Sequence, residues 1–160
     1  MMSIYKFIDY LVDENTDDIY VDRDYRKLMD VCQQYSEYFS YIYHDGVNDI
    51  VELKPFIYKQ IYTYHWPGTW RTNEGGIYRV YFCNHKSIAI LKERTRDLFG
   101  FNDVPEDITF YRKDKSIFME TISHEGECFL FPKPGEDISD VISKNGWIKT
   151  DDPIDEEIYF

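Results

Sequence analysis

Three short apolar segments in the second half of the chain limit what it can fold into. They read ITFYR, SIFMETIS and CFLF, and the polar sequences KDK and HEGE separate them. The segments are rich in Ile, Phe, Tyr and Thr, which favour strands, and each separator is short enough for a tight turn. This spacing predicts a three-stranded antiparallel meander between Ile108 and Phe131.

Apolar residues at helical spacing predict several helices elsewhere in the chain. We expect a short amphipathic helix over Ser3–Val12 and a longer one over Arg23–Tyr43. A third helix is expected to run to Phe99, with Asn84 or Ser87 as its cap. The sequence EDISDVISKNG predicts a short last helix, because acidic residues come first and Asn-Gly ends it.

Two further strands are expected before the meander. GIYRVYFCN, residues 76–84, is typical of a strand, and so is FIYKQIYTYHW, residues 56–66. The loop PGTWRTNEGG joins them, which favours a hairpin with a long connection. Pro55 and the apolar residues after it also fit the start of a helix, so helix and strand both remain open for residues 55–65.

These elements together predict an α+β fold. We expect an antiparallel sheet of about five strands, with three or four helices packed mainly on one face. A chain of 160 residues fits a single globular domain over residues 1–160. The sequence DDPIDEEIYF, residues 151–160, is expected to be a loose acidic tail.

The net charge of the chain limits the classes of molecule that it is expected to bind. The formal net charge is -12 and the pI is about 4.7. Such a chain repels phosphates, so nucleic acids and anionic membrane surfaces are unexpected partners. No secretion signal is expected, because Lys6 interrupts the first apolar stretch, and the three widely spaced cysteines are typical of free thiols in a reducing cytoplasm.

The sequence TISHEGECFLFP is the main candidate for catalysis. His124, Glu127 and Cys128 lie within five residues, and Glu120 comes shortly before them in an apolar strand. A small hydrolase or metal-dependent enzyme could use these four groups, with His124 as acid or base. We favour the plainer interpretation, in which HEGE is a hairpin turn and its side chains point apart. Arg79 is a possible partner for Glu120.

Motifs for common cofactor and metal chemistry are missing from the sequence. It contains no G-x-G-x-x-G, G-x-x-x-x-G-K-[ST] or G-x-S-x-G, and no H-E-x-x-H or paired C-x-x-C. No cofactor and no metal site are therefore expected.

Aromatic residues indicate binding to another protein. Trp66 and Trp70 flank a Pro-Gly turn, and Arg71 follows the second Trp. Trp, Tyr and Arg dominate protein-binding surfaces, so these three residues are the expected binding residues. Six tyrosines crowd the first half of the chain, and several are expected at the surface: Tyr20, Tyr25, Tyr35, Tyr38, Tyr41 and Tyr43.

Two functions remain open. The first is a non-enzymatic, acidic protein that binds or inhibits a basic protein partner, as an immunity protein or antitoxin does. The alternative is the small enzyme built on His124 and its neighbouring carboxylates.

Overall fold

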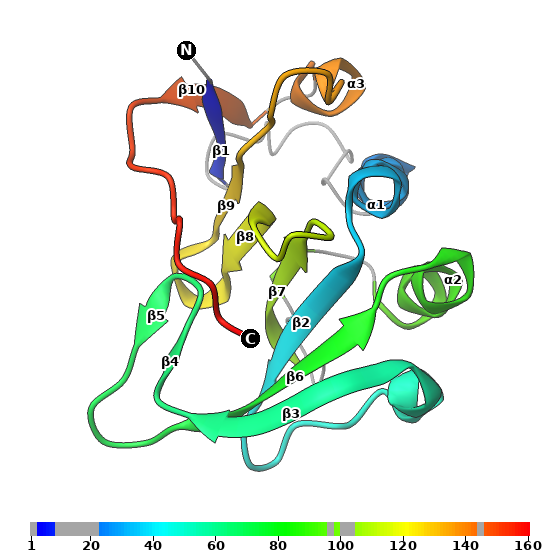
Figure 1. The fold of residues 1–160 in the computed structure, drawn as a ribbon, viewed down its shortest axis with the longest axis vertical. Coiled ribbons are helices and arrows are strands. Elements are labelled where there is room, and N and C mark those ends of the chain that lie inside the picture. Colours follow the sequence, from blue (N-terminus) through cyan, green and yellow to red (C-terminus); the bar gives the residue numbers. More distant parts are fainter. Residues whose placement is uncertain (1–2, 9–22, 96–97, 100–104, 144–145) are drawn as a thin grey trace, which may run out of the picture.

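The computed structural model describes residues 3–8, 23–95, 98–99, 105–143 and 146–160. Its main feature is an eight-stranded antiparallel sheet in the order β10-β1-β9-β8-β7-β2-β6-β3 (Figure 1). The strands are β1 (Ile4–Ile8), β2 (Tyr38–Tyr43), β3 (Ile57–Thr63), β6 (Gly76–Phe82), β7 (Glu106–Tyr111), β8 (Ile117–Ile122), β9 (Glu127–Leu130) and β10 (Trp147–Thr150). A second, two-stranded sheet consists of β4 (His65–Trp66) and β5 (Thr69–Trp70).

The predicted meander is confirmed. β7, β8 and β9 follow one another along the chain and pair antiparallel in that order. The HEGE connection forms a single 3₁₀ turn, η3 (Ser123–Glu125), and Gly126 then takes a left-handed φ of 64°. Glycine adopts this conformation without the steric cost of a side chain, so the turn can close directly into β9.

Of the two structures that the sequence left open for residues 55–65, the strand is present and the helix beginning at Pro55 is not, because Pro55 lies near the end of a short helix that precedes the strand. A 3₁₀ helix, η2 (Val51–Phe56), precedes β3, which pairs with β6 as expected. β3 stands at the end of the strand order, and it pairs only with β6 among the described strands. It is therefore an edge strand whose outer backbone groups remain open to a partner.

The prediction of a helix over Ser3–Val12 is wrong for those of its residues that the structure describes. Ile4–Ile8 form β1, a strand between β9 and β10, while residues 9–12 lie outside the described residues. Ile4 and Phe7 pack in different apolar clusters because they point to opposite faces of the sheet. β10 itself was not predicted.

The helix expected over Arg23–Tyr43 is too long. It forms as α1 (Arg23–Tyr35), and the following residues Tyr38–Tyr43 form β2 in the middle of the sheet. Of the six tyrosines among which several were expected at the surface, Tyr25, Tyr41 and Tyr43 are buried. Tyr35 and Tyr38 are partly buried, and Tyr20 lies outside the described residues.

Two other expected helices are present. α2 (His85–Arg94) is capped by Asn84, whose side chain accepts hydrogen bonds from the backbone N–H groups of Lys86 and Ser87. The prediction extended this helix to Phe99, whereas it ends before Thr95. α3 (Ser139–Ile142) is the short last helix. None of the helices in the described part of the chain is long and apolar enough to cross a membrane.

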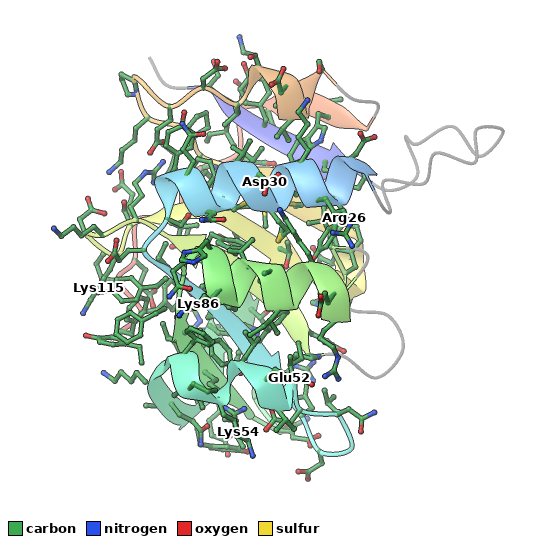
Figure 2. The ribbon with its side chains drawn as sticks, turned by 90° about the vertical axis from the view of Figure 1, so that its right-hand side faces the viewer. Arg26, Asp30, Glu52, Lys54, Lys86 and Lys115 are labelled. Carbon is green, nitrogen blue, oxygen red and sulfur yellow. The ribbon has the colours of Figure 1, made fainter. Side chains whose placement is uncertain are left out.

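One face of the sheet packs against α1, α2 and η2, which lie side by side (Figure 2). Ion pairs tie the three together: Lys92 of α2 pairs with Asp30 of α1, and Arg94 of α2 pairs with Glu52 of η2. Beneath them, Phe39, Tyr81 and Phe110 of the sheet are fully buried.

The opposite face is also covered, although by no helix of the residues that the structure describes. A second apolar cluster there contains Trp66 from the β4–β5 hairpin, together with Ile42, Tyr78 and Tyr111 of the sheet. The expected fold class is therefore wrong. The sheet has eight strands rather than about five, a small second sheet accompanies it, and the helices are few and short.

Residues 151–160 have no regular secondary structure, yet they differ from the loose tail that was expected. The segment runs from β10 past the β4–β5 hairpin toward β2 (Figure 1). The Phe160 ring packs edge-on against Tyr111 and Tyr38, with ring centroids 4.9 and 5.2 Å apart. His65 Nε2 lies 2.9 Å from Glu157 Oε2, which ties the tail to the hairpin.

Candidate functional site

The two tryptophans that flank the Pro-Gly turn were both expected to bind a partner, but one is buried and the other is exposed. Trp66 is 1% exposed, and its indole Nε1 donates a 2.8 Å hydrogen bond to Asp107 Oδ2. Trp70 is 73% exposed and meets His65 edge-on, with ring centroids 4.1 Å apart. Arg71 is exposed, and its guanidinium carbon lies 5.9 Å from the Trp66 ring centroid. Trp66 thus anchors the hairpin, while Trp70 and Arg71 face solvent.

The exposed Trp70 belongs to a larger surface that the sequence did not indicate. Its members are large exposed side chains of β3, of the β4–β5 hairpin and of the residue between them, which we call the aromatic edge: Tyr58, Ile61, Tyr62, Tyr64 and Trp70. Tyr62 is 62% exposed, and its ring meets that of Tyr64 edge-on at 5.6 Å. The alternation of β3 could have indicated one exposed face, but its place at the sheet edge exposes side chains on both faces.

Acidic residues flank the aromatic edge. The tail residue Glu157 lies beside His65, whose ring contacts that of Trp70 edge-on. Asp45 and Glu74 line a hollow of about 370 Å³ together with Tyr62. A partner that covers the aromatic edge therefore also meets carboxylates.

The four candidate catalytic groups do not gather at one place. His124 is exposed on the turn, where its Nε2 lies 3.8 Å from Glu125 Oε1. Cys128 pairs with Thr121 and is buried in the cluster beneath the helices. Glu120 and Glu127 instead lie together in a pocket on the opposite face. Among the described residues, no group of three or more His, Cys, Asp or Glu side chains is placed to hold a metal ion.

We call this hollow the carboxylate pocket. It measures about 290 Å³ and lies between β1, β8, β9 and the tail. Four acidic residues line it, namely Glu120, Glu127, Asp152 and Asp155. Lys6 lines it too, with its Nζ 3.1 Å from Glu127 Oε1.

Glu120 is the buried acid of the pocket. Its side chain is 5% exposed, and its Oε2 has no hydrogen-bond partner among the described residues. Burial raises the pKa of Glu120 to about 8, and Asp155 adds to the shift through its charge and a side-chain hydrogen bond to Glu120, as does the charge of Asp107. A carboxyl with this pKa is mostly protonated at neutral pH.

Arg79 is not the partner of Glu120. Its Nη1 lies 2.9 Å from Asp49 Oδ1, and its guanidinium carbon lies 4.4 Å from the Tyr43 ring centroid. Tyr43 belongs to the cluster beneath the helices, so Arg79 and Glu120 lie on opposite faces of the sheet.

The turn of the β4–β5 hairpin rests directly on Glu120. Gly68 has a φ of 77°, which suits the third residue of a type II turn after Pro67. A Cβ atom at Gly68 would lie 2.6 Å from Glu120 Oε1 and 2.7 Å from Ile122 Cγ1. The hairpin can therefore approach β8, the strand of Glu120 and Ile122, only because residue 68 is glycine.

The cysteines give a testable prediction about nucleophilic chemistry. Burial raises the pKa of Cys32 and Cys128 well above the usual range, and it raises the pKa of Cys83 to about 12. Because the thiolate is the reactive form, we expect all three thiols to react with a thiol-specific reagent at least roughly a hundredfold more slowly than a free cysteine at pH 7. The same reagent should modify all three at once in guanidinium chloride. Rapid modification of Cys128 in the folded protein would restore it as a candidate nucleophile.

A scan against models of known protein families, a search of curated proteins and a search of solved structures each found no match to this chain.

Proposed function

We propose that this protein binds a basic protein partner through the aromatic edge. The observation that carries the proposal is the exposure of Tyr62 and Trp70 on an edge strand and its adjoining hairpin. Large aromatic side chains at the surface are characteristic of protein-binding sites, because they bury much area at a low cost in side-chain entropy. An inhibitor of the immunity or antitoxin kind, acting on a basic protein, fits these properties.

The edge position of β3 supports the same proposal. A strand with open backbone groups can add an extended segment of a partner to the sheet, and alternate side chains then provide specificity. Monomeric proteins usually protect such edges with short strands or several charges. β3 is seven residues long, and Lys59 is its one charged residue.

The charge of the chain supports a basic partner rather than an acidic or neutral one. A net charge of -12 accelerates association with a positively charged protein and repels other acidic proteins. Glu157 and Glu74 place part of this charge beside the aromatic edge. Binding should accordingly weaken as the salt concentration rises.

Site-specific photo-cross-linking in an extract of the native cells tests the proposal. A photo-reactive amino acid replaces Trp70, and in a control protein it replaces the exposed Lys86 of α2 (Figure 2). We expect position 70 to capture one basic protein that position 86 does not, and mass spectrometry identifies it. Capture of the same proteins at both positions, or of acidic proteins only, contradicts the proposal.

The captured protein then permits an affinity measurement. We expect Trp70→Ala and Tyr62→Ala each to weaken binding by roughly 10- to 30-fold, which is typical of aromatic residues at the centre of an interface. Val51→Ala is the matched control, because Val51 is an exposed apolar residue of η2 outside the aromatic edge. Equal loss in all three variants would place the binding surface elsewhere.

A further inference from the structure

The carboxylate pocket contains one buried acidic residue, Glu120, and the residues that line it carry a net negative charge. Its four carboxyl groups face a single lysine, Lys6. Glu120 stands out because it is 5% exposed and its Oε2 receives no hydrogen bond from a donor among the described residues, although its carboxyl group is hydrogen-bonded to that of Asp155. A buried carboxyl oxygen without a partner is costly, and a donor entering the pocket would remove that cost.

The walls of the pocket suit a flat or elongated cation. Phe129 and Phe131 present nearly parallel rings, with an interplanar angle of 6° and centroids 6.2 Å apart. Lys6 Nζ lies 5.3 Å from the Phe129 ring centroid, so one cation of the chain already uses this ring. Guanidinium groups bind aromatic faces and carboxylates together, more readily than ammonium groups do.

The size of the pocket favours a side chain over a larger ligand. Its volume of about 290 Å³ is at or below the lower end of the roughly 300–1,000 Å³ found for pockets of drug-sized ligands. The pocket also neighbours the proposed binding surface, since the Gly68 turn of the hairpin touches Glu120 and Trp70 follows that turn closely.

We propose that the carboxylate pocket receives an arginine side chain of the basic partner, with Glu120 as its buried ion-pair acceptor. The inference rests on the proposed function, because the partner supplies the arginine. The Glu120 carboxylate accepts N–H bonds from the guanidinium, and Phe129 and Phe131 contact its flat face. Asp152 and Asp155 stand nearer the open side and add to the attraction.

The protonation state of Glu120 makes the binding of the arginine side chain depend on pH. Its surroundings are mostly acidic or neutral: Asp107 and Tyr111 of β7, Glu127 of β9, and Asp152, Asp155 and Tyr159 of the tail, with Lys6 of β1 as the cation. Glu120 must lose its proton to pair with a guanidinium, and its pKa is about 8 in the free protein. The affinity should therefore fall by up to roughly tenfold for each pH unit below that value.

The full chain and a small probe test the inference without the partner. N-acetyl-arginine methylamide is the probe, and the neutral isostere N-acetyl-citrulline methylamide is its control; binding is followed by chemical shifts in NMR spectra. We expect the arginine probe to bind and the citrulline probe to bind at least roughly tenfold more weakly. Equal binding of the two, or no binding of either at tens of millimolar, overturns the inference.

Variants separate a role in the pocket from a general effect on folding. Glu120→Gln should weaken the arginine probe by at least roughly tenfold and remove the pH dependence, while the exposed Glu125→Gln leaves both unchanged. Lys6→Met should act in the opposite direction and strengthen binding severalfold, because it releases Glu127 and removes a competing cation. An unchanged affinity in Glu120→Gln, or a loss in Lys6→Met, contradicts the assigned geometry.

These results are separable from those for the proposed function. Cross-linking from position 70 reports on the partner, whereas the arginine probe reports on the pocket alone. A captured basic protein together with a silent probe overturns only the arginine pocket. A binding probe without any captured basic protein overturns the proposed function and leaves the pocket as a site for guanidinium groups.

Discussion

Replacing Trp66 with Ala should destabilise the protein by about 3–5 kcal/mol, the range for removing a large aromatic residue from a core. Trp66 is 1% exposed and packs in the cluster that covers the sheet face opposite the helices. The change leaves a cavity beneath the β4–β5 hairpin. It also removes the hydrogen bond to Asp107 Oδ2 and leaves that buried oxygen without its donor.

Trp70→Ala is the control for this prediction, because it makes the same change in the same hairpin at an exposed position. Its effect should stay within about 0.5 kcal/mol. Trp66→Phe should fall between the two, at about 1–3 kcal/mol, since a ring remains but the indole N–H is lost. Urea denaturation followed by far-UV circular dichroism measures all three without relying on tryptophan fluorescence. Similar losses for Trp66→Ala and Trp70→Ala would mean that the hairpin does not anchor through Trp66.

The second large effect concerns the pH dependence of stability at Glu120. Its pKa is about 8 in the folded protein against 4.5 for the unperturbed group, so the folded state holds a proton that the unfolded chain releases. The stabilisation is fully present below about pH 4.5 and is lost as the pH rises through 8. Between these values, Glu120 should lower the free energy of unfolding by about 1.4 kcal/mol per pH unit.

Glu120→Gln isolates this contribution, because glutamine keeps the shape of the protonated acid and cannot ionise. Near pH 9 the variant should be more stable than the unmodified chain by several kcal/mol, up to about 5, and near pH 4.5 the two should be similar. Denaturant midpoints across this pH range provide the measurement. Glu125→Gln, at an exposed position, should leave the pH profile unaltered. Parallel profiles for Glu120→Gln and the unmodified chain would show that the acid ionises freely in the folded state.

Between Gly76 and Leu130, local sequence signals were sufficient for the strands and for the start of the helix, although not for the end of α2, which was expected at Phe99. β6 and the meander strands are short, β-rich segments, and polar sequences that can only form turns separate the meander strands. Asn84 fixes the start of α2 by capping its first N–H groups, which depends on neighbouring residues alone. Each of these features is decided within a few residues, so it could be read without the rest of the fold.

Ser3–Val12 was wrongly predicted as a helix because β1 carries apolar residues on both faces, with Lys6 as its one charged residue, so no polar side reveals the strand. Ile4 faces one apolar cluster and Phe7 the other, and the resulting spacing of apolar residues imitates a helix. Tyr38–Tyr43 was wrongly predicted as part of a helix for the same reason. Phe39 and Ile42 lie on opposite faces of β2, yet their spacing continues the helical pattern from Tyr35. Only the neighbours of β1 and β2 in the sheet distinguish these strands from helices.

For the candidate sites too, some features could be inferred from the sequence and others were decided by the tertiary structure. A buried carboxyl at Glu120 could be suspected from its place in an apolar strand, but Asp152 and Asp155 reach it only because the tail crosses the sheet. Trp66 and Trp70 carry the same side chain four residues apart, and the sequence assigns both to binding. The Pro67-Gly68 turn then directs one indole into the core and leaves the other in solvent.

By itself, the sequence determined the turns, the capped helix, the strands of the meander and the strongly acidic charge. These follow from backbone preferences and composition, which neighbouring residues decide. The tertiary structure alone decided the eight-strand order, the covered second face, the open edge at β3 and the pocket around Glu120. Each of these joins segments distant along the chain, and burial on both sides of a strand removes the alternation that would have announced it.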